Sequence, residues 1–341
     1  MPDEHANFIP PESQSKQPRL AEEDASRTRQ RFDTLRAEVG RVIVGQHDLV
    51  EGLLIALLSG GHALVEGLPG VAKSTAVATL ASAVDLSYRR IQFTPDLLPA
   101  DITGAEVFRP QTGAFETRRG PIFTSVVLAD EINRAPAKVQ SALLEAMQER
   151  QVTIAGESIP LPDPFLVLAT QNPIEEDGTY ELPEAQTDRF LLKILVPYPS
   201  GADELEILNR AVATTPAAVQ SVLSRDELMA AIASAKQVFL DDNLKAYLVR
   251  LVVATRDPES VSSSLADAIR TGVSPRATLG LAAAARAAAL LDGRTFATPD
   301  DVKRVAFPVL RHRLALSYEA LADRRTADSV VAELLETVPV P

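Results

Sequence analysis

The chain has 341 residues, 46% of them hydrophobic, and its 34 Lys and Arg stand against 46 Asp and Glu, which gives a formal net charge of −12. This length suffices for two domains with separate cores, and the acidic balance argues against a chain-wide attraction to nucleic acid or anionic lipid. Because the chain has no cysteine, a disulfide framework, a thiolate nucleophile and a cysteine-based metal centre are excluded. The N-terminus resembles no signal peptide and no uncharged apolar run is long enough to cross a bilayer, so we expect a cytoplasmic protein with no membrane insertion.

Residues 1–28 are polar and rich in proline and charge, which predicts a disordered tail. Helices are expected over 29–39 and 48–58, with a turn between them. From residue 60 to about 198, strand-like runs alternate with helical stretches, and several runs are apolar on both faces, as in a covered parallel sheet. The expected strands are 62–66, 88–94, 122–129, 165–171 and 191–196.

The pattern changes at the Pro-Ser-Gly of 199–201, where we expect a domain boundary. Helical patterns dominate from there on, and the expected helices are 202–213, 225–238, 243–256, 277–291, 299–318 and 327–337. The chain is therefore predicted to hold a doubly wound α/β domain with a parallel sheet over 29–199, followed by a smaller all-helical domain over 200–341.

Residues 67–74 read Gly-Leu-Pro-Gly-Val-Ala-Lys-Ser and lie between an apolar run and a helix-compatible run, which is the context of a phosphate-binding loop. Gly67 and Gly70 let the backbone curl so that N–H groups converge on phosphate oxygens. Lys73 can place its charge on the β- and γ-phosphates, and the Ser74 hydroxyl can bind Mg²⁺. The alternative is a glycine-bearing turn before a helix, with Lys and Ser there by chance.

Ala72 departs from the usual pattern, since glycine commonly precedes the lysine of this motif. Alanine has the smallest Cβ, and we expect it to be tolerated in the first turn of the following helix. The segment is therefore interpreted as a variant phosphate loop.

A second buried strand ends in two acids, because the apolar run 126–129 continues directly into Asp130 and Glu131. Burial of adjacent carboxylates at the end of a strand costs free energy, so their presence needs an explanation. With a phosphate loop upstream, Asp130 is assigned to the Mg²⁺ shell, and Glu131 to orienting and deprotonating the attacking water. The alternative is a strand that leaves the core with two surface acids.

Three further polar positions have two interpretations each. Thr170 or Asn172, at the end of the strand over 165–171, could reach the γ-phosphate or the attacking water, unless Asn172 only begins a turn. Arg189 either makes a structural salt bridge or reaches the phosphates of a neighbouring subunit. Arg276 begins a helix, where it is either solvated or reports the nucleotide state to the second domain.

The chain resembles the MoxR-type AAA+ ATPases over roughly residues 30–320. The matching segments, in family order, are 67–74, 128–149, 169–173, 182–190 and 274–277. The resemblance implies an AAA+ P-loop NTPase core with a helical lid, ATP and Mg²⁺ as cofactors, and a homo-oligomeric ring that is usually hexameric. It also implies a chaperone-like ATPase that remodels or assembles partner proteins, typically proteins with a von Willebrand factor A domain.

The resemblance further implies roles for individual residues. Ser74 and Asp130 would hold Mg²⁺, Glu131 would be the catalytic base, and Val44 and Gly45 would lie near the adenine. The phosphate contacts would come from Gly67, Leu68, Pro69, Gly70, Val71, Ala72, Lys73, Ser74 and Thr75.

The resemblance implies two sensor residues and one arginine finger. Asn172 would be the first sensor. Arg189 would be the arginine finger acting in trans, a role for which Arg134 competes. Arg276 would be the second sensor and would also contact nucleotide.

Two segments, 95–120 and 151–161, resemble the inserts of this AAA+ branch, which face the ring centre and touch substrate. Alternation around Gly156 also predicts a hairpin for the second segment; ordinary surface hairpins are the alternative for both. The other functions considered are a nucleic-acid motor or loader, which the net acidity disfavours, a small-molecule kinase, and a scaffold that binds nucleotide but hardly hydrolyses it.

Overall fold

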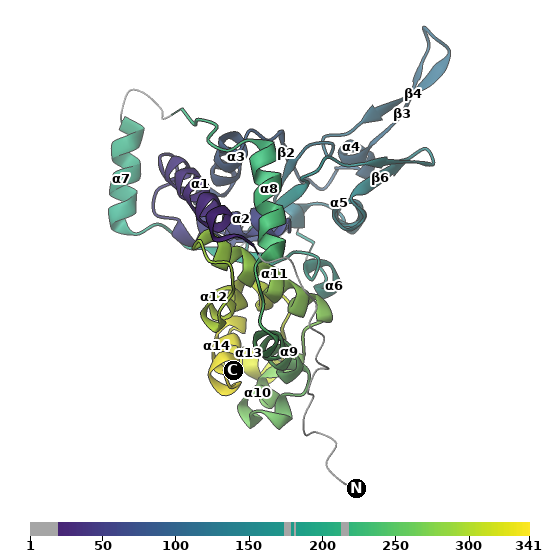
Figure 1. Ribbon diagram of the computed structural model, residues 1–341. Coiled ribbons are helices and arrows are strands. Elements are labelled where there is room, and N and C mark those ends of the chain that lie inside the picture. Colours follow the sequence, from purple (N-terminus) through teal and green to yellow (C-terminus); the bar gives the residue numbers. More distant parts are fainter. Residues whose placement is uncertain (1–19, 174–178, 181, 213–217) are drawn as a thin grey trace.

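The computed structural model describes residues 20–173, 179–180, 182–212 and 218–341. An α/β body carries two projecting hairpins, and a helical region lies below it (Figure 1). None of the described helices is long and apolar enough to cross a membrane.

The α/β body is built on one five-stranded sheet with the order β2-β5-β8-β1-β9, in which all neighbouring strands are parallel. The strands are β1 (Ala63–Gly67), β2 (Tyr88–Gln92), β5 (Val126–Asp130), β8 (Leu166–Gln171) and β9 (Leu192–Val196). Every residue of β5 is buried, as the run of apolar residues predicted. The predicted doubly wound parallel sheet is thus confirmed, and the carboxyl ends of β1, β5 and β8 lie side by side.

Helices cover both faces of this sheet, because alternate strand residues point to opposite sides. Val65, Leu128 and Leu168 belong to the core on the side of α1, α2 and α3, whereas Val127 and Val167 belong to the core on the side of α5. The helices of these two layers are α1 (Glu22–Gly40), α2 (His47–Ser59), α3 (Lys73–Ala83), α4 (Pro99–Thr103) and α5 (Ala137–Glu149).

The predicted N-terminal tail ends earlier than residue 28. Helix α1 begins at Glu22 because Ala25, Thr28, Phe32 and Leu35 form a buried stripe at helical spacing. The boundary at residue 28 is therefore wrong, while residues 1–19 lie outside the described residues.

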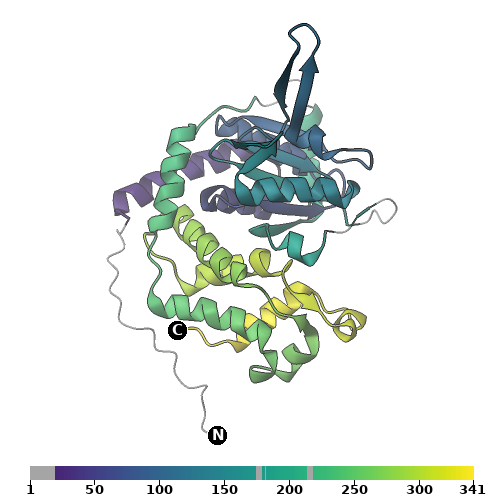
Figure 2. The same cartoon turned by 90° about the vertical axis from the view of Figure 1, so that its right-hand side faces the viewer.

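Two antiparallel hairpins extend from the body on the α5 side. Strands β3 (Gly104–Arg109) and β4 (Ala114–Arg119) form the longer one, which projects well beyond the sheet (Figures 1 and 2). Strands β6 (Gln151–Ile154) and β7 (Glu157–Pro160) form the shorter one. Both fall within the two segments that resemble family inserts.

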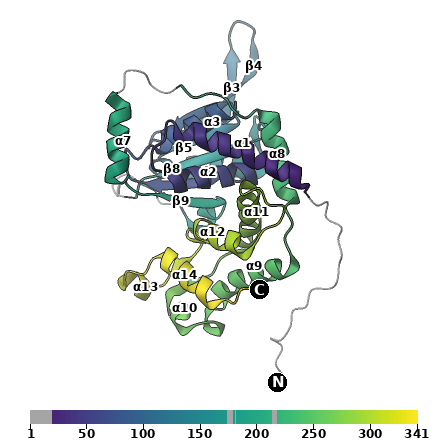
Figure 3. The same cartoon turned by 60° about the vertical axis from the view of Figure 1, so that its left-hand side comes forward.

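Helices make up most of the described part of the chain after β9, which also holds an antiparallel pairing of β10 (Ile269–Thr271) with β11 (Ala315–Leu316) and an isolated bridge between Phe239 and Phe296. Helix α8 lies against α1 and α2 on the α/β body, and α7 stands at the outer edge of that body (Figure 3). Helices α9 to α14 make up the lower region. The helices after β9 are α7 (Gly201–Val212), α8 (Arg225–Gln237), α9 (Asp242–Arg256), α10 (Ser263–Ala268), α11 (Pro275–Leu291), α12 (Pro299–Leu310), α13 (Tyr318–Ala322) and α14 (Ala327–Thr337). The remaining short elements are η1 (Ile132–Arg134), α6 (Glu184–Thr187) and η2 (Pro258–Ser260).

The single helix expected over 299–318 is wrong, because the structure divides this segment. Helix α12 ends at Leu310, and α13 begins at Tyr318. In between, the side chain of Arg313 turns inward and donates hydrogen bonds to Asp188 and to the carbonyl of Leu191. Tertiary contacts of these charged side chains therefore override the helical pattern.

Candidate functional site

The loop between β1 and α3 bends as a phosphate-binding loop does. Gly70 has φ +84°, in the region that favours glycine. A Cβ at Gly67 would lie only 2.7 Å from the carbonyl oxygen of Val196, so no side chain fits at that position. Residues 69–75 line a pocket of about 380 Å³ at the carboxyl edge of the sheet. Backbone amides at the start of α3 therefore face a cavity large enough for phosphate groups.

Ala72 lies outside the helix that was expected to accommodate it. It is the N-cap residue of α3 and has φ 62° and ψ 21°, which is left-handed backbone. A Cβ is unfavourable in this conformation, which explains why glycine commonly occupies the position. The expectation of a helical first turn at Ala72 is therefore wrong.

The side chains of Lys73 and Ser74 line the pocket and donate hydrogen bonds within the site. Lys73 Nζ donates to the carbonyl oxygens of Gly67 and Leu68, the latter at 3.0 Å. Ser74 Oγ donates to Asp130 Oδ2 at 3.2 Å. The structure thus joins the end of β5 to the start of α3, as the sequence predicted.

Thr170 on β8 fixes Asp130, the last residue of β5, and Glu131, which follows it. Its Oγ1 donates to Asp130 Oδ1 at 2.5 Å and accepts the backbone N–H of Glu131 at 2.8 Å. Thr170 is 1% exposed and Asp130 is 6% exposed, so both groups are held away from bulk water. The Thr170 hydroxyl therefore positions both acids, and a contact of Thr170 or Asn172 with the γ-phosphate or the attacking water stays a prediction.

The side chain of Glu131 lies at the mouth of the pocket between two donors. Gln92 Nε2 donates to Glu131 Oε2 at 2.8 Å, and Arg134 Nη1 donates to the same oxygen at 3.0 Å. Glu131 itself adopts left-handed backbone with φ 56°, a conformation that is uncommon outside glycine and frequent at functional sites. Arg134, the competing arginine finger, is thus an ion-pair partner of Glu131 in its own chain.

Asn172 reaches the same pocket. It follows the last residue of β8, is 5% exposed, and lines the cavity beside the phosphate loop. Its position fits a group that would touch the outermost phosphate or the attacking water. The sensor role itself stays a prediction.

Neither Arg90, which lines the pocket, nor Gln92, which hydrogen-bonds to Glu131, was identified from the sequence. Arg90 lines the pocket, and its Nε and Nη2 lie 2.8 and 2.6 Å from Asp130 Oδ2. Arg90 Nη2 also donates to Gln92 Oε1 at 2.9 Å. Both residues lie on β2 and share one face of that strand, while Gln92 is in register with Asp130. The missing information was that β2 neighbours β5, which the chain order does not specify.

The side chains present fit a magnesium site. Among the described residues, no group of three or more His, Cys, Asp or Glu is arranged to hold a metal ion. Mg²⁺ bound with a nucleotide needs only one or two protein oxygens, since phosphate and water oxygens complete its octahedron. Ser74 and Asp130 supply two such oxygens 3.2 Å apart, beside the phosphate loop.

Arg276 and Arg189 lie at the other end of the sheet. They border a separate cavity of about 260 Å³ together with Gly61 and His62, which precede β1. Strand β1 advances about 13 Å from Ala63 to Gly67 at the usual rise per residue, and the phosphate pocket lies beyond its end. The structure therefore does not bring Arg276 or Arg189 to the phosphate loop of the same chain.

An ion-pair cluster fixes this arginine-rich end. Asp188 Oδ1 accepts from Arg313 Nε at 2.9 Å, and its Oδ2 accepts from Ser274 Oγ at 2.9 Å and Arg276 Nη1 at 3.3 Å. Arg189 Nη1 donates to the carbonyl of Leu144 at 2.9 Å. The Arg313 side chain is 3% exposed. The cluster therefore holds the helical region against the segment that leads into β9. Arg276 and Arg189 are thus held on one surface.

His62, beside this cluster, is a buried neutral residue. Its Nδ1 accepts the N–H of Val167 at 2.9 Å, and its Nε2 lies 3.2 Å from the carbonyl of Met147. Burial, with a smaller repulsion from Arg150, lowers the pKa of His62 to about 3. The residue therefore links β1, β8 and α5 as an uncharged hydrogen-bonding group.

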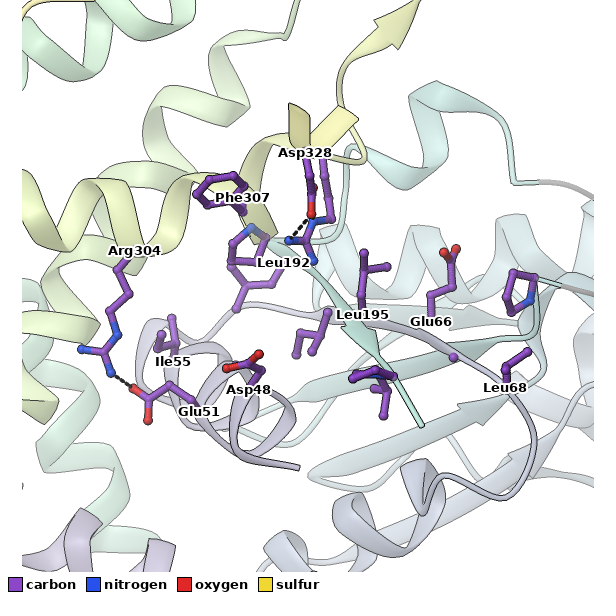
Figure 4. Close-up of a pocket in the computed structure, with 18 residues that line it drawn as sticks. Asp48, Glu51, Ile55, Glu66, Leu68, Leu192, Leu195, Arg304, Phe307 and Asp328 are labelled. Carbon is purple, nitrogen blue, oxygen red and sulfur yellow. Dashed lines mark hydrogen bonds and ion pairs between the residues drawn. The ribbon is translucent and has the colours of Figure 1, made fainter. Parts of the chain in front are cut away.

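A larger cavity adjoins the phosphate loop on the β9 side. It has a volume of about 660 Å³ and lies between α2, β9 and α12, with Leu68 at one end (Figure 4). Ion pairs border it, Arg304 with Glu51 at 2.5 Å and Arg311 with Asp328 at 2.9 Å. Among the described residues that line the two cavities, neither Val44 nor Gly45 occurs. Their placement near adenine stays a prediction.

The comparisons with known proteins agree with this fold. Residues 62–192 match the model of the ATPase family associated with various cellular activities (AAA), and residues 262–334 match that of an AAA lid domain. The chain is 52% identical to Chaperone MoxR1 of Mycobacterium tuberculosis over 89% of this chain and 81% of that one. It is 34% identical to Protein MoxR of Paracoccus denitrificans over 91% and 96%. A crystal structure from Cytophaga hutchinsonii, described as a candidate ATPase, superposes with a TM-score of 0.88 at 43% identity and covers 94% of this chain and 98% of that one.

Proposed function

Because the chain belongs to the MoxR family of AAA+ ATPases, we propose that it binds ATP with Mg²⁺ and hydrolyses it to remodel or assemble partner proteins. The observation that carries the proposal is the convergence of Lys73, Ser74, Asp130 and Glu131 on one pocket. A structural salt bridge alone would not explain why amides, a lysine and two acids line the same cavity.

The residues divide the work of phosphoryl transfer to water. Backbone amides of residues 70–75 and the positive end of α3 would bind the phosphates, with Lys73 as a point charge on them. Ser74 and Asp130 would hold Mg²⁺, which when bound offsets charge on the phosphate oxygens. Glu131 would take a proton from the attacking water as the water oxygen bonds to the γ-phosphorus and ADP leaves.

Sites shared between subunits are supported by the position of the arginines. Arg189 and Arg276 lie far from their own phosphate loop yet on a common surface, so we infer that they complete the pocket of a neighbouring subunit in a ring, as a hexamer would allow. Helix α7 supports the same inference. All of its 12 described residues are exposed or half-exposed, and Leu205, Leu208 and Val212 form an exposed apolar stripe. A helix of this length is marginal without packing, so a second copy would stabilise it.

The longer hairpin is our candidate for contact with a client protein. Phe108 and Phe115 face each other across β3 and β4 with ring centroids 5.3 Å apart. They are 50% and 67% exposed, which is unusual for paired aromatic rings and typical of interaction sites. We propose that the client is a protein with a von Willebrand factor A domain.

Hydrolysis and client binding can be tested with one variant. Glu131→Gln removes the base but keeps the shape of the side chain, so it should bind ATP without consuming it. With ATP and Mg²⁺ present, the variant should form a larger oligomer than the ATP-free protein and retain a purified von Willebrand factor A protein on a column. Glu149→Gln, an exposed position at the end of α5, is the matched control. Phosphate release by Glu131→Gln at the wild-type rate would contradict the proposal.

A further inference from the structure

The feature that the proposed function leaves unexplained is the arginine inside the phosphate pocket. Of the described residues that line this pocket, Lys73 and Arg90 are the cations. Lys73 belongs to the loop motif, whereas Arg90 comes from β2 and points at the metal ligand Asp130 instead of the loop. A cation that faces a metal ligand competes with the metal for it.

Both carboxylate oxygens of Asp130 already accept hydrogen bonds from neighbouring side chains. Oδ2 accepts from Arg90 Nε at 2.8 Å, lies 2.6 Å from Arg90 Nη2, and also accepts from Ser74 Oγ. Oδ1 is held by Thr170, which is buried. The three donors to Oδ2 take up its lone pairs. Asp130 therefore offers its metal-facing oxygen only after Arg90 moves away.

We propose that Arg90 is a displaceable counter-ion that holds Asp130, the acceptor of Ser74, in place without nucleotide. It must leave Asp130 Oδ2 before that oxygen can accept a metal ion. This inference rests on the proposed function, because it assumes that Mg²⁺ binds at Asp130 and Ser74. Arg90 is a positioning residue in this scheme. It sets how much free Mg²⁺ the protein requires, and it does not bind phosphate.

The position of Arg90 allows this movement. Its side chain is 55% exposed, whereas that of Asp130 is 9% exposed, so the arginine can swing into solvent while the acid stays fixed. Its Nη2 also donates to Gln92, which in turn donates to Glu131. Release of Arg90 therefore removes one contact of the amide that holds the catalytic base. Metal binding and the orientation of Glu131 are linked through these two residues.

The test measures nucleotide binding, which does not depend on turnover. A fluorescent, non-hydrolysable ATP analogue is titrated at graded free Mg²⁺ with the wild-type chain, Arg90→Ala and Arg89→Ala. Arg89→Ala is the matched control, since Arg89 is the preceding residue of β2 and is exposed, and its substitution removes the same charge. Arg90→Lys keeps the charge without the forked donors. Thermal melting of each variant confirms that the fold is intact.

We expect Arg90→Ala to lower the Mg²⁺ concentration for half-maximal binding roughly two- to fivefold, equivalent to about 0.4–1 kcal/mol. Arg90→Lys should fall between wild type and Arg90→Ala, and Arg89→Ala should match the wild type. With EDTA present, Arg90→Ala and Arg89→Ala should bind the analogue equally.

Two results would overturn the counter-ion role while leaving the proposed function intact. One is an unchanged or higher Mg²⁺ requirement in Arg90→Ala. The other is a loss of affinity in EDTA specific to Arg90→Ala, which would make Arg90 a phosphate ligand. If the wild-type chain failed to bind the analogue at any Mg²⁺ concentration, the proposed function itself would be wrong, and the role of Arg90 with it.

Discussion

The buried neutral His62 makes the stability of the protein depend on pH. In the unfolded chain a histidine has a pKa of about 6.5, whereas burial lowers the pKa of folded His62 to about 3. The unfolded state therefore binds the proton first as the pH falls. The stabilisation is complete above pH 6.5 and is lost progressively towards pH 3.

The size of the effect follows from these two values. Between pH 7.5 and 5.5 the unfolded state gains about 1.4 kcal/mol relative to the folded state from this one histidine. His312 acts in the same direction, because burial holds its pKa well below the usual value. Carboxyl groups contribute little in this interval, since their usual pKa values lie near 4.

The assay is urea unfolding at pH 7.5 and 5.5 of the wild-type chain and His62→Gln. The variant should be less stable at pH 7.5, because the N–H of Val167 loses its acceptor. Its loss of stability between the two pH values should be smaller than that of wild type by about 1.4 kcal/mol. His47→Gln, at an exposed position on α2, is the control. An equal pH effect in wild type and His62→Gln would show that His62 is not the source of the pH dependence.

Three further substitutions test separate parts of the structure. Ala72→Gly removes a Cβ from left-handed backbone, so we expect the unfolding free energy to rise by up to about 1 kcal/mol after the entropy of glycine is counted; a lower melting temperature would contradict this. Thr170→Val leaves the buried N–H of Glu131 without its acceptor, which should cost about 1–3 kcal/mol in urea unfolding and weaken Mg²⁺-dependent nucleotide binding; retention of both would show that the hydroxyl is dispensable. Asp188→Asn leaves the buried Arg313 without its counter-charge, with an expected loss of about 3 kcal/mol; a variant as stable as wild type would mean that solvent reaches the cluster.

The parts of the fold that sequence predicted are those with local signals. The all-apolar run over 126–129 identified a buried strand because no alternation was present, and the acids after it marked the carboxyl edge of the sheet. The loop over 67–74 needs particular residues at fixed positions, so its location was readable without knowing the fold. Even so, the left-handed backbone at Ala72 emerged only from the structure.

The parts that sequence missed depend on which segments become neighbours. Arg90 and Gln92 look like surface residues of an amphipathic strand, and only the pairing of β2 with β5 brings them to the acids. Likewise, the distance of Arg276 from the phosphate loop depends on how the helical region packs. Asp188 and Arg313 fix that packing although they are 125 residues apart in the chain. Helix α1 is different, since its buried stripe from Ala25 onward was visible in the sequence and was overlooked.

We propose that ATP is bound by the loop at Lys73 and cleaved beside Glu131. The most direct measurement follows ATP binding by calorimetry and phosphate release by a coupled assay in the same preparations of wild type, Lys73→Ala and Glu131→Gln. We expect Lys73→Ala to lose both activities, and Glu131→Gln to bind ATP as wild type does while its turnover falls at least about 100-fold. Normal turnover in Glu131→Gln, or undiminished ATP binding in Lys73→Ala, would contradict it.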